Sequence, residues 1–322
     1  MPQKRDLLIA ALALVLLPFA FTGIGMGLTS ATEGVIFAIA CMALNILVGT
    51  TGLTSFGHGA WFGLAAYAAA LAQLHWFPGS FLWPVATGLA VIIVTATVFG
   101  FLILRRRGVY FSLLTLALCA LTFAIAFRWT AVTGGEGGLG GLERYRLGPL
   151  NLDDHLTYYA FVALIAFAAI WAMHRFVRSP FGHVLVAIRE NEQRATFIGY
   201  DSARYKLLAF VLSTTITALA GALLVFLHRL AAAESTTVAF SGEMLAMVVI
   251  GGMRSFLGPA LGVLFYLMFR ELFSIVTANW LLWFGLVFVG FVIFSPTGLV
   301  GIAGKIHRRL RPPPEESAAM SR

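Results

Sequence analysis

Residues 178–206 read R-S-P-F-G-H-V-L-V-A-I-R-E-N-E-Q-R-A-T-F-I-G-Y-D-S-A-R-Y-K, the one long charged segment with a helical pattern in an otherwise apolar chain. Pro180 and Gly182 are expected to break the preceding helix. Gly199 is expected to end a second helix at about 184–199, and Asp201 or Ser202 to cap the next one. The apolar residues that fall near one face of this second helix are Val184, Ile188, Ala195 and Ile198. Such a helix between two membrane spans either lies on the membrane surface or docks into a soluble partner.

The composition around this segment is that of a protein surrounded by lipid. The 322 residues are 60% hydrophobic and 11% charged, whereas a soluble domain carries about 25% charged residues. A water-soluble core cannot bury so much apolar surface, so the lipid bilayer must be the solvent. The net charge of +8 does not indicate nucleic-acid binding, because the chain has no basic stripe interleaved with aromatic residues.

Ten apolar segments approach or exceed the length that crosses a bilayer, which is about 20 helical residues for a core about 30 Å thick. They are residues 7–28, 31–49, 58–76, 80–104, 109–128, 157–177, 205–229, 238–252, 257–276 and 279–300. The eighth is short, which predicts a tilted or broken helix. The first resembles a signal peptide but lacks a cleavage site, so we expect it to be retained. The sequence therefore predicts an all-α integral membrane protein, a polytopic bundle of about 8–10 transmembrane helices.

The lysines and arginines predict how these spans are oriented. With the N-terminus in the cytoplasm and all ten segments crossing, 17 of the 22 basic residues face the cytoplasm. The remaining ones are Arg128, Arg144, Arg146, Arg229 and Arg270. Both termini and the 178–206 segment are then cytoplasmic. We expect residues 1–304 to form the transmembrane domain, and residues 305–322 to form a basic, Pro-rich cytoplasmic tail near anionic lipid.

The loop at about 129–156 is predicted to lie outside the cytoplasm. It contains T-G-G-E-G-G-L-G-G-L at residues 133–142. Glycines at this density permit tight turns and a close approach of backbones. A flexible connector is the interpretation that we favour.

Small residues in two spans are candidates for helix packing or for a transport pathway. The stretches T-S-F-G-H-G-A at 54–60 and R-S-F-L-G-P-A at 254–260 form a weak internal repeat. Each leads into a pair of glycines four residues apart, a spacing that lets helix backbones approach closely. The candidates are Ser55, Gly57, His58, Gly59, Gly63, Gly258 and Gly262.

Ionisable residues inside spans are costly in lipid and are often functional. The candidates are Glu243, Arg270 and Glu271. Arg270 and Glu271 are adjacent, so they cannot face each other on a helix, and each is expected to pair with another helix. No chain of Asp, Glu and His runs across the spans, which counts against a proton-coupled carrier.

The sequence carries no enzyme motif. The pair Gly304-Lys305 is followed by Ile306, so it is not the end of a phosphate-binding G-x-x-x-x-G-K-S/T loop. There is no G-x-S-x-G, no H-E-x-x-H and no cluster of Cys and His. We therefore expect no enzymatic activity, no metal and no cofactor, and a transport function would need an external motor or an ion gradient.

Several stretches match the motifs of one known family. They are the run from Ser179 to Phe210, G-L-T-S-F-G-H-G-A-W-F-G-L-A-A-Y at 52–67, R-G-V-Y-F-S-L-L-T-L-A at 107–117, M-V-V-I-G-G-M-R-S-F-L-G-P-A-L-G at 247–262 and S-P-T-G-L-V-G at 295–301. Together they resemble the permeases of branched-chain amino acid ABC transporters, of the LivM type. The resemblance covers roughly residues 30 to 302.

The resemblance implies a subunit of an ATP-driven importer in the bacterial inner membrane. It implies cytoplasmic ATP-binding subunits, a second and different permease chain, and a periplasmic binding protein that delivers branched-chain or other hydrophobic amino acids. The family's coupling segment, on which ATP-driven closure pushes, falls on Arg189, Glu190, Asn191, Glu192, Arg194, Ala195 and Gly199. Aligned on Gly199, it matches the E-A-A-x-x-x-G loop of ABC permeases only in part, because those positions here read Gln193-Arg194-Ala195.

Other functions remain open at this stage. The same scaffold serves permeases for urea, short amides or other small solutes. A different class is a secondary transporter or channel that acts alone on an ion gradient, and another is a membrane scaffold without transport.

Overall fold

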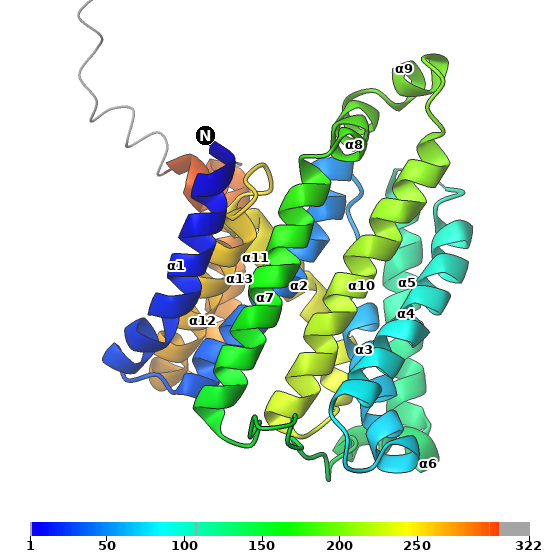
Figure 1. Ribbon diagram of the computed structural model, residues 1–322. Helices are drawn as coiled ribbons and strands as arrows, with labels where there is room; N and C mark the ends of the chain where they lie inside the picture. Colours follow the sequence, from blue (N-terminus) through cyan, green and yellow to red (C-terminus); the bar gives the residue numbers. More distant parts are fainter. Residues whose placement is uncertain (1, 107, 296, 303–322) are drawn as a thin grey trace, which may run out of the picture.

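The computed structural model describes residues 2–106, 108–295 and 297–302. The tail expected at 305–322 lies outside these residues. Within the described ranges the chain is helical, with isolated β-bridges and no strand. The predicted all-α fold is confirmed (Figure 1).

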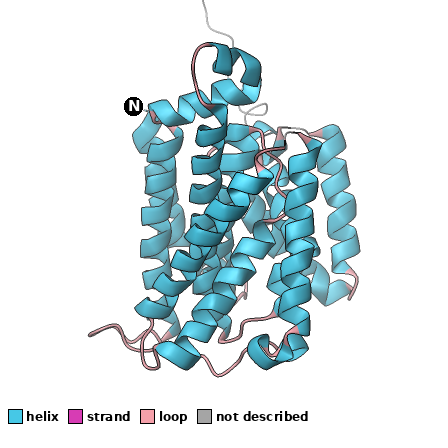
Figure 2. Cartoon of the chain, turned by 90° about the vertical axis from the view of Figure 1, so that its right-hand side faces the viewer, coloured by secondary structure: helices cyan, strands magenta, loops and turns pink. Residues whose placement is uncertain are grey.

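Ten helices correspond to the ten predicted segments, and Figure 2 shows them aligned roughly along one axis. In the described residues, 7 are long and apolar enough to cross a membrane. These are α1 (Pro2–Gly23), α2 (Leu28–Asn45), α4 (Leu82–Ile103), α5 (Val109–Arg128), α7 (His155–Val177), α10 (Ser202–His228) and α12 (Gly258–Val276). The shorter ones are α3 (His58–Leu71), α11 (Val238–Gly251) and α13 (Trp280–Phe294). The π-helices η1 (Ile46–Thr51) and η2 (Ala72–Trp76) extend α2 and α3.

The core of the bundle is built by α2 and α10, which pack against each other and against α3. In α2 with η1, 89% of the most apolar stretch is buried, whereas in α1 the share is 11%. The outer helices expose many large apolar side chains, such as Phe19, Val94 and Leu164. A helical surface this apolar is stable only in lipid, where every backbone polar group is satisfied within the helix.

One end of the bundle carries two short helices, α8 (Pro180–Glu190) and α9 (Glu192–Phe197), which project beyond the long ones (Figures 1 and 2). The start of α1 lies at the same end, where Arg178 donates a 2.7 Å hydrogen bond to Asp6. The turn at 252–257 also lies there, because Asn45 at the end of α2 donates to the Ser255 carbonyl at 3.2 Å. We call this the α8 end, and the other the α6 end after α6 (Thr130–Thr133).

Two of the short helices start deep inside the bundle (Figure 1). The chain leaves η1 at the α8 end and turns back, and α3 begins at His58 beside Ser213. Ser213 is 11 residues into α10, or about 16 Å along it. The start of α11 meets the same region, because Ser241 accepts a 2.8 Å hydrogen bond from the Gly59 N–H. Non-helical backbone at membrane depth is tolerated only where protein surrounds it. In the first interruption Ser55 and Gly57 are buried, and in the second Ala233 and Thr236 are.

The glycine-rich loop at 129–156 does not form the flexible connector that we favoured. Gly134, Gly135 and Gly138 adopt φ values between +62° and +72° and fold the chain into tight turns. Leu139 then exchanges two 2.9 Å backbone hydrogen bonds with Ala231, and a Cβ on Gly138 would collide with the Ala231 carbonyl. The glycines of this loop therefore serve the other role that we considered, which is to permit tight turns and a close approach of backbones.

Arg144, in the same loop, ties this turn region to the end of α10. Its guanidinium donates to the carbonyls of Phe226 at 2.8 Å and Leu227 at 2.9 Å. The last carbonyls of a helix have no partner within the helix, so this buried side chain satisfies them. Sequence reasoning counted Arg144 only as a charge on the predicted outer side.

Candidate functional site

The projecting helices at the α8 end begin at a sharp break after α7. Ser179 caps α8 by accepting a hydrogen bond from the Gly182 N–H at 3.3 Å. Pro180 is the first helical residue, a position where its missing N–H has no cost. A Cβ on Gly182 would collide with the Val177 carbonyl, so α8 can leave the end of α7 only with glycine there.

The predicted single helix at 184–199 is wrong, because the chain is broken at Asn191. This residue has extended backbone angles (φ −157°, ψ 97°), ends α8, and caps α9 by accepting the Arg194 N–H at 2.9 Å. Asn side chains compete with helical hydrogen bonds and favour such caps. Ile198, which we placed near the apolar face of the predicted helix, is 70% exposed. The projecting segment therefore consists of two short helices, α8 and α9, which meet at Asn191, and we call it the lever.

One set of side chains holds α8 and α9 against the bundle. Arg189 of α8 donates a hydrogen bond to the Gly49 carbonyl of η1. Its aliphatic stem lies so close to Gly52 (φ +75°) that a Cβ on that glycine would collide with it. On α9, Ala195 is buried against the bundle.

A charged pair joins α9 to the start of α10. Glu192 lies 2.7 Å from the Lys206 ammonium and accepts a 2.9 Å hydrogen bond from the Ser202 hydroxyl. The side chains of Glu192 and Lys206 are only 22% and 10% exposed. Partial burial strengthens the attraction between them relative to a surface pair.

The opposite side of the lever faces away from the protein. Glu190 and Arg194 are exposed on it. Gly199 makes the final turn with φ +103°, a conformation that other residues rarely adopt. Next to this turn lie three exposed large side chains, which we call the tip patch: Phe197 (90% exposed), Ile198 (70%) and Tyr200 (41%). Sequence reasoning missed the patch. The run F-I-G-Y at 197–200, large apolar residues within a polar segment, could have indicated it.

A polar cluster lies at mid-bundle where α3 and α11 begin. The two ring nitrogens of His58 are each 3.0 Å from a hydroxyl, that of Ser55 and that of Ser213. All three residues are fully buried. The Ser213 hydroxyl also donates to the Ala43 carbonyl of α2 at 2.6 Å. The cluster thus joins α2, α3 and α10, and its hydroxyl partner Ser213 was missed because isolated serines in apolar helices carry no pattern.

The candidate glycines sit where backbones nearly touch. A Cβ on Gly57 would meet the Thr115 carbonyl of α5 at 2.5 Å, and one on Gly59 would meet the Ser241 hydroxyl at 2.7 Å. A Cβ on Gly63 would collide with Thr236. On α12, added carbons at Gly258 and Gly262 would collide with the carbonyls of Gly252 and Met247. At each of these positions the absent side chain makes the observed packing possible.

The ionisable candidates inside the spans all have partners on other helices. Arg270 of α12 binds both carboxylate oxygens of Glu33 on α2, at 2.9 and 3.0 Å. Glu243 of α11 accepts a 2.6 Å hydrogen bond from the Tyr266 hydroxyl. Glu271 accepts one from Ser30 at 3.5 Å. Sequence reasoning did not identify Glu33 as the partner of Arg270. In the described part of the chain, no group of His, Cys, Asp and Glu is placed to hold a metal.

Comparison with known proteins places this architecture in a family. The family described as branched-chain amino acid transport system / permease component matches residues 26–295. The chain belongs to this family. The match includes the projecting helices, the mid-bundle cluster and the paired ionisable residues, so this permease carries all of these features within the family region.

Individual relatives agree with this assignment. The high-affinity branched-chain amino acid transport system permease protein LivM of Salmonella typhimurium is 28% identical over 92% of this chain and 75% of its own. The LivM protein of Escherichia coli is 27% identical over the same shares. The probable branched-chain amino acid transport permease protein LivM of Methanocaldococcus jannaschii is 26% identical over 66% of this chain and 68% of its own. No solved structure matches the chain. The permease is thus a multi-pass membrane protein of a transport family.

Proposed function

We propose that this permease forms the membrane pathway of an ATP-driven importer for branched-chain or other hydrophobic amino acids. The observation that carries the proposal is the lever at the α8 end, which is anchored inward by Arg189 and Glu192 and presents the tip patch outward. An exposed apolar patch on a polar protrusion marks a surface for a protein partner. The names of the relatives supply the substrate class.

The partners follow from what the chain lacks. It has no phosphate-binding loop, so ATP would be hydrolysed by separate cytoplasmic ATP-binding subunits seated on the tip patch. The pathway is completed by a second, different permease chain. A periplasmic binding protein delivers the substrate and sets the specificity, which is why no polar amino-acid site is needed in the pathway.

The proposed orientation places the permease in the bacterial inner membrane with the α8 end on the cytoplasmic side. The end of α4 at 104–106 and the connections at 178–201 and 252–257 lie at this end together with the start of α1 (Figure 1). Together with Arg175, Arg204 and Lys206 next to them, they carry 11 basic residues among the described ones, whereas 5 lie elsewhere (Arg128, Arg144, Arg146, Arg229 and Arg270). Cytoplasmic loops carry such an excess of basic residues. A reporter fused after Asn191 is expected to read cytoplasmic, and one inserted at Gly140 periplasmic. The reverse readout would overturn the orientation.

The function is tested by purifying the permease with its co-expressed partners and reconstituting the complex in vesicles. We expect ATP hydrolysis to rise several-fold when a loaded binding protein is added, and uptake of leucine, isoleucine or valine to require ATP. The permease alone is the control, and it should move no solute. Uptake by the permease alone on an ion gradient would support the stand-alone transporter instead.

A further inference from the structure

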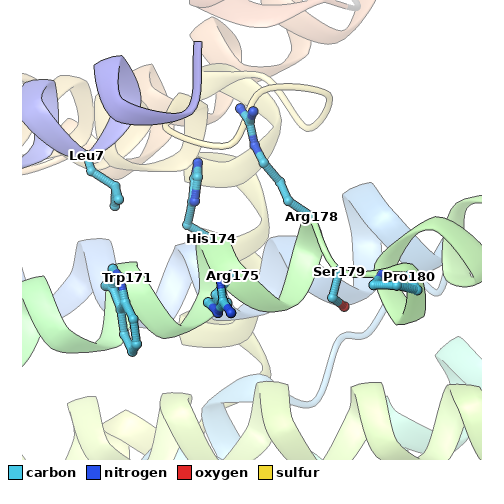
Figure 3. Close-up of a pocket in the computed structure, with 7 residues that line it drawn as sticks. All are labelled: Leu7, Trp171, His174, Arg175, Arg178, Ser179 and Pro180. Atoms are coloured by element: carbon cyan, nitrogen blue, oxygen red, sulfur yellow. The ribbon is translucent and has the colours of Figure 1, made fainter. Parts of the chain in front are cut away.

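A cavity of about 400 Å³ opens between α1 and α7 at the α8 end. It is lined by Leu7 of α1 and by residues 171–180 at the end of α7 and the start of α8. Figure 3 shows His174 and Arg178 projecting from α7 toward α1, which carries Leu7, and Trp171 and Arg175 projecting to the other side of α7 in this view. This cavity is distant from the tip patch and from the mid-bundle cluster.

The charges around the cavity are mainly positive. Arg178 binds Asp6 at 2.7 Å and is the partner of that carboxylate. Arg175 is exposed and makes no hydrogen bond or ion pair with any described residue, so its guanidinium is accessible to an outside anion. A cavity that offers one uncommitted guanidinium and one shared guanidinium suits a phosphate group.

His174 forms part of the cavity wall together with the two arginines. The residue is only 6% exposed, and its Nε2 atom has no hydrogen-bond partner in the described part of the chain. The nearest carboxylate oxygen, on Asp6, is 3.8 Å away, beyond hydrogen-bonding distance. The Nε2 atom is closed off from solvent and lies near Asp6, so the two arginines supply the positive charge that a ligand in the cavity can reach.

The same face of α7 continues as an apolar groove. Further along α1 and α7 lies a second cavity of about 630 Å³, lined by apolar side chains such as Leu14, Phe19 and Phe167. Trp171 stands between the two cavities and is 53% exposed. Tryptophan is enriched where the bilayer meets water, so the basic cavity lies at head-group depth and the groove at acyl-chain depth.

We propose that the basic cavity binds the head group of an anionic phospholipid whose acyl chain lies in the groove between α1 and α7. Free phosphate would use the basic cavity but not the groove, and a zwitterionic lipid would use the groove but not the excess positive charge. Only an anionic lipid uses both. Basic pockets between transmembrane helices recognise such head groups. The proposal does not depend on the transport function.

The test is native mass spectrometry of the purified, delipidated complex titrated with phosphatidylglycerol or with phosphatidylcholine of the same acyl chains. We expect retention of phosphatidylglycerol only, weakened about fivefold by Arg175→Gln, as one surface charge predicts. The matched control is Arg106→Gln, which removes an exposed arginine at the same end and should change nothing. Asp6→Asn should tighten binding, because it removes a like charge and frees Arg178, whereas damage to the fold would weaken it.

A second readout uses Trp171 itself. Phosphatidylglycerol with brominated chains should quench tryptophan fluorescence more in the wild type than in Trp171→Phe, and brominated phosphatidylcholine should not. Equal retention of the two lipids, displacement of the lipid by inorganic phosphate, or cross-linking of Arg175→Cys to a partner subunit would each overturn the proposal.

Discussion

Replacing Phe197 with glutamate is expected to abolish association of the ATP-binding subunits with the permease. Phe197 is 90% exposed at the end of α9 and is the largest apolar contact that the lever offers. Aromatic side chains at the centre of an interface are energetic hot spots, and a buried unpaired charge in the same place adds a desolvation cost. The expected loss of affinity is more than about 100-fold.

The measurement is co-purification of the ATP-binding subunits on a tag carried by the permease. Ala203→Glu is the matched control, because it adds the same charge to another exposed position nearby, in the first turn of α10. The control should retain its partners, and both variants should reach the membrane. If Phe197→Glu retained the ATP-binding subunits at the wild-type level, the tip patch would not be the docking surface.

Ile198→Asp is expected to act in the same direction with a smaller effect, because its side chain is smaller and 70% exposed. A graded response across two positions of the patch distinguishes a docking surface from a local folding defect. Circular dichroism of the two variants should match that of the wild type, since neither side chain is buried in the permease itself.

The sequence predicted the helices from hydropathy, since a span needs only length and apolar composition. The predicted segment at 58–76 begins at His58, where α3 starts, but hydropathy could not show that this start lies deep in the bundle beside Ser213. It also could not show the pairing of Arg270 with Glu33, which joins residues 237 positions apart. Such contacts depend on which helices become neighbours, and the hydropathy of a single segment does not show which helices pack against it.

The lever illustrates the same limit at closer range. The amphipathic pattern at 184–199 is real up to Ile188, and the cap at Asn191 then changes the direction of the chain. A pattern of apolar residues averages over such a corner. As a result, sequence reasoning treated the inward and outward residues of this segment alike. Only the structure shows that Arg189 and Glu192 bind the permease itself, whereas the side chains of Phe197 and Ile198 point away from it.

Removing Arg189 is expected to leave the complex assembled but uncoupled. Its guanidinium joins α8 to the Gly49 carbonyl, and its stem packs on Gly52, at the point where α2 ends and the chain turns back toward α3. A push on the tip patch would therefore reach α2 and α3 through this contact. In Arg189→Ala the tip patch is intact, so the ATP-binding subunits should bind normally.

The measurement compares ATP hydrolysis with and without loaded binding protein in reconstituted complexes. We expect Arg189→Ala to lose the stimulation and to reduce uptake at least about tenfold, which corresponds to about 1.4 kcal/mol of coupling. Arg204→Ala is the control, because it removes an arginine that is 84% exposed and whose partner is Asp201 within the same turn. Arg189→Lys should be intermediate, since lysine keeps the charge but not the planar fork. Normal stimulation in Arg189→Ala would show that force passes through the Glu192–Lys206 contact to α10 instead, and loss of assembly would place Arg189 in the docking surface.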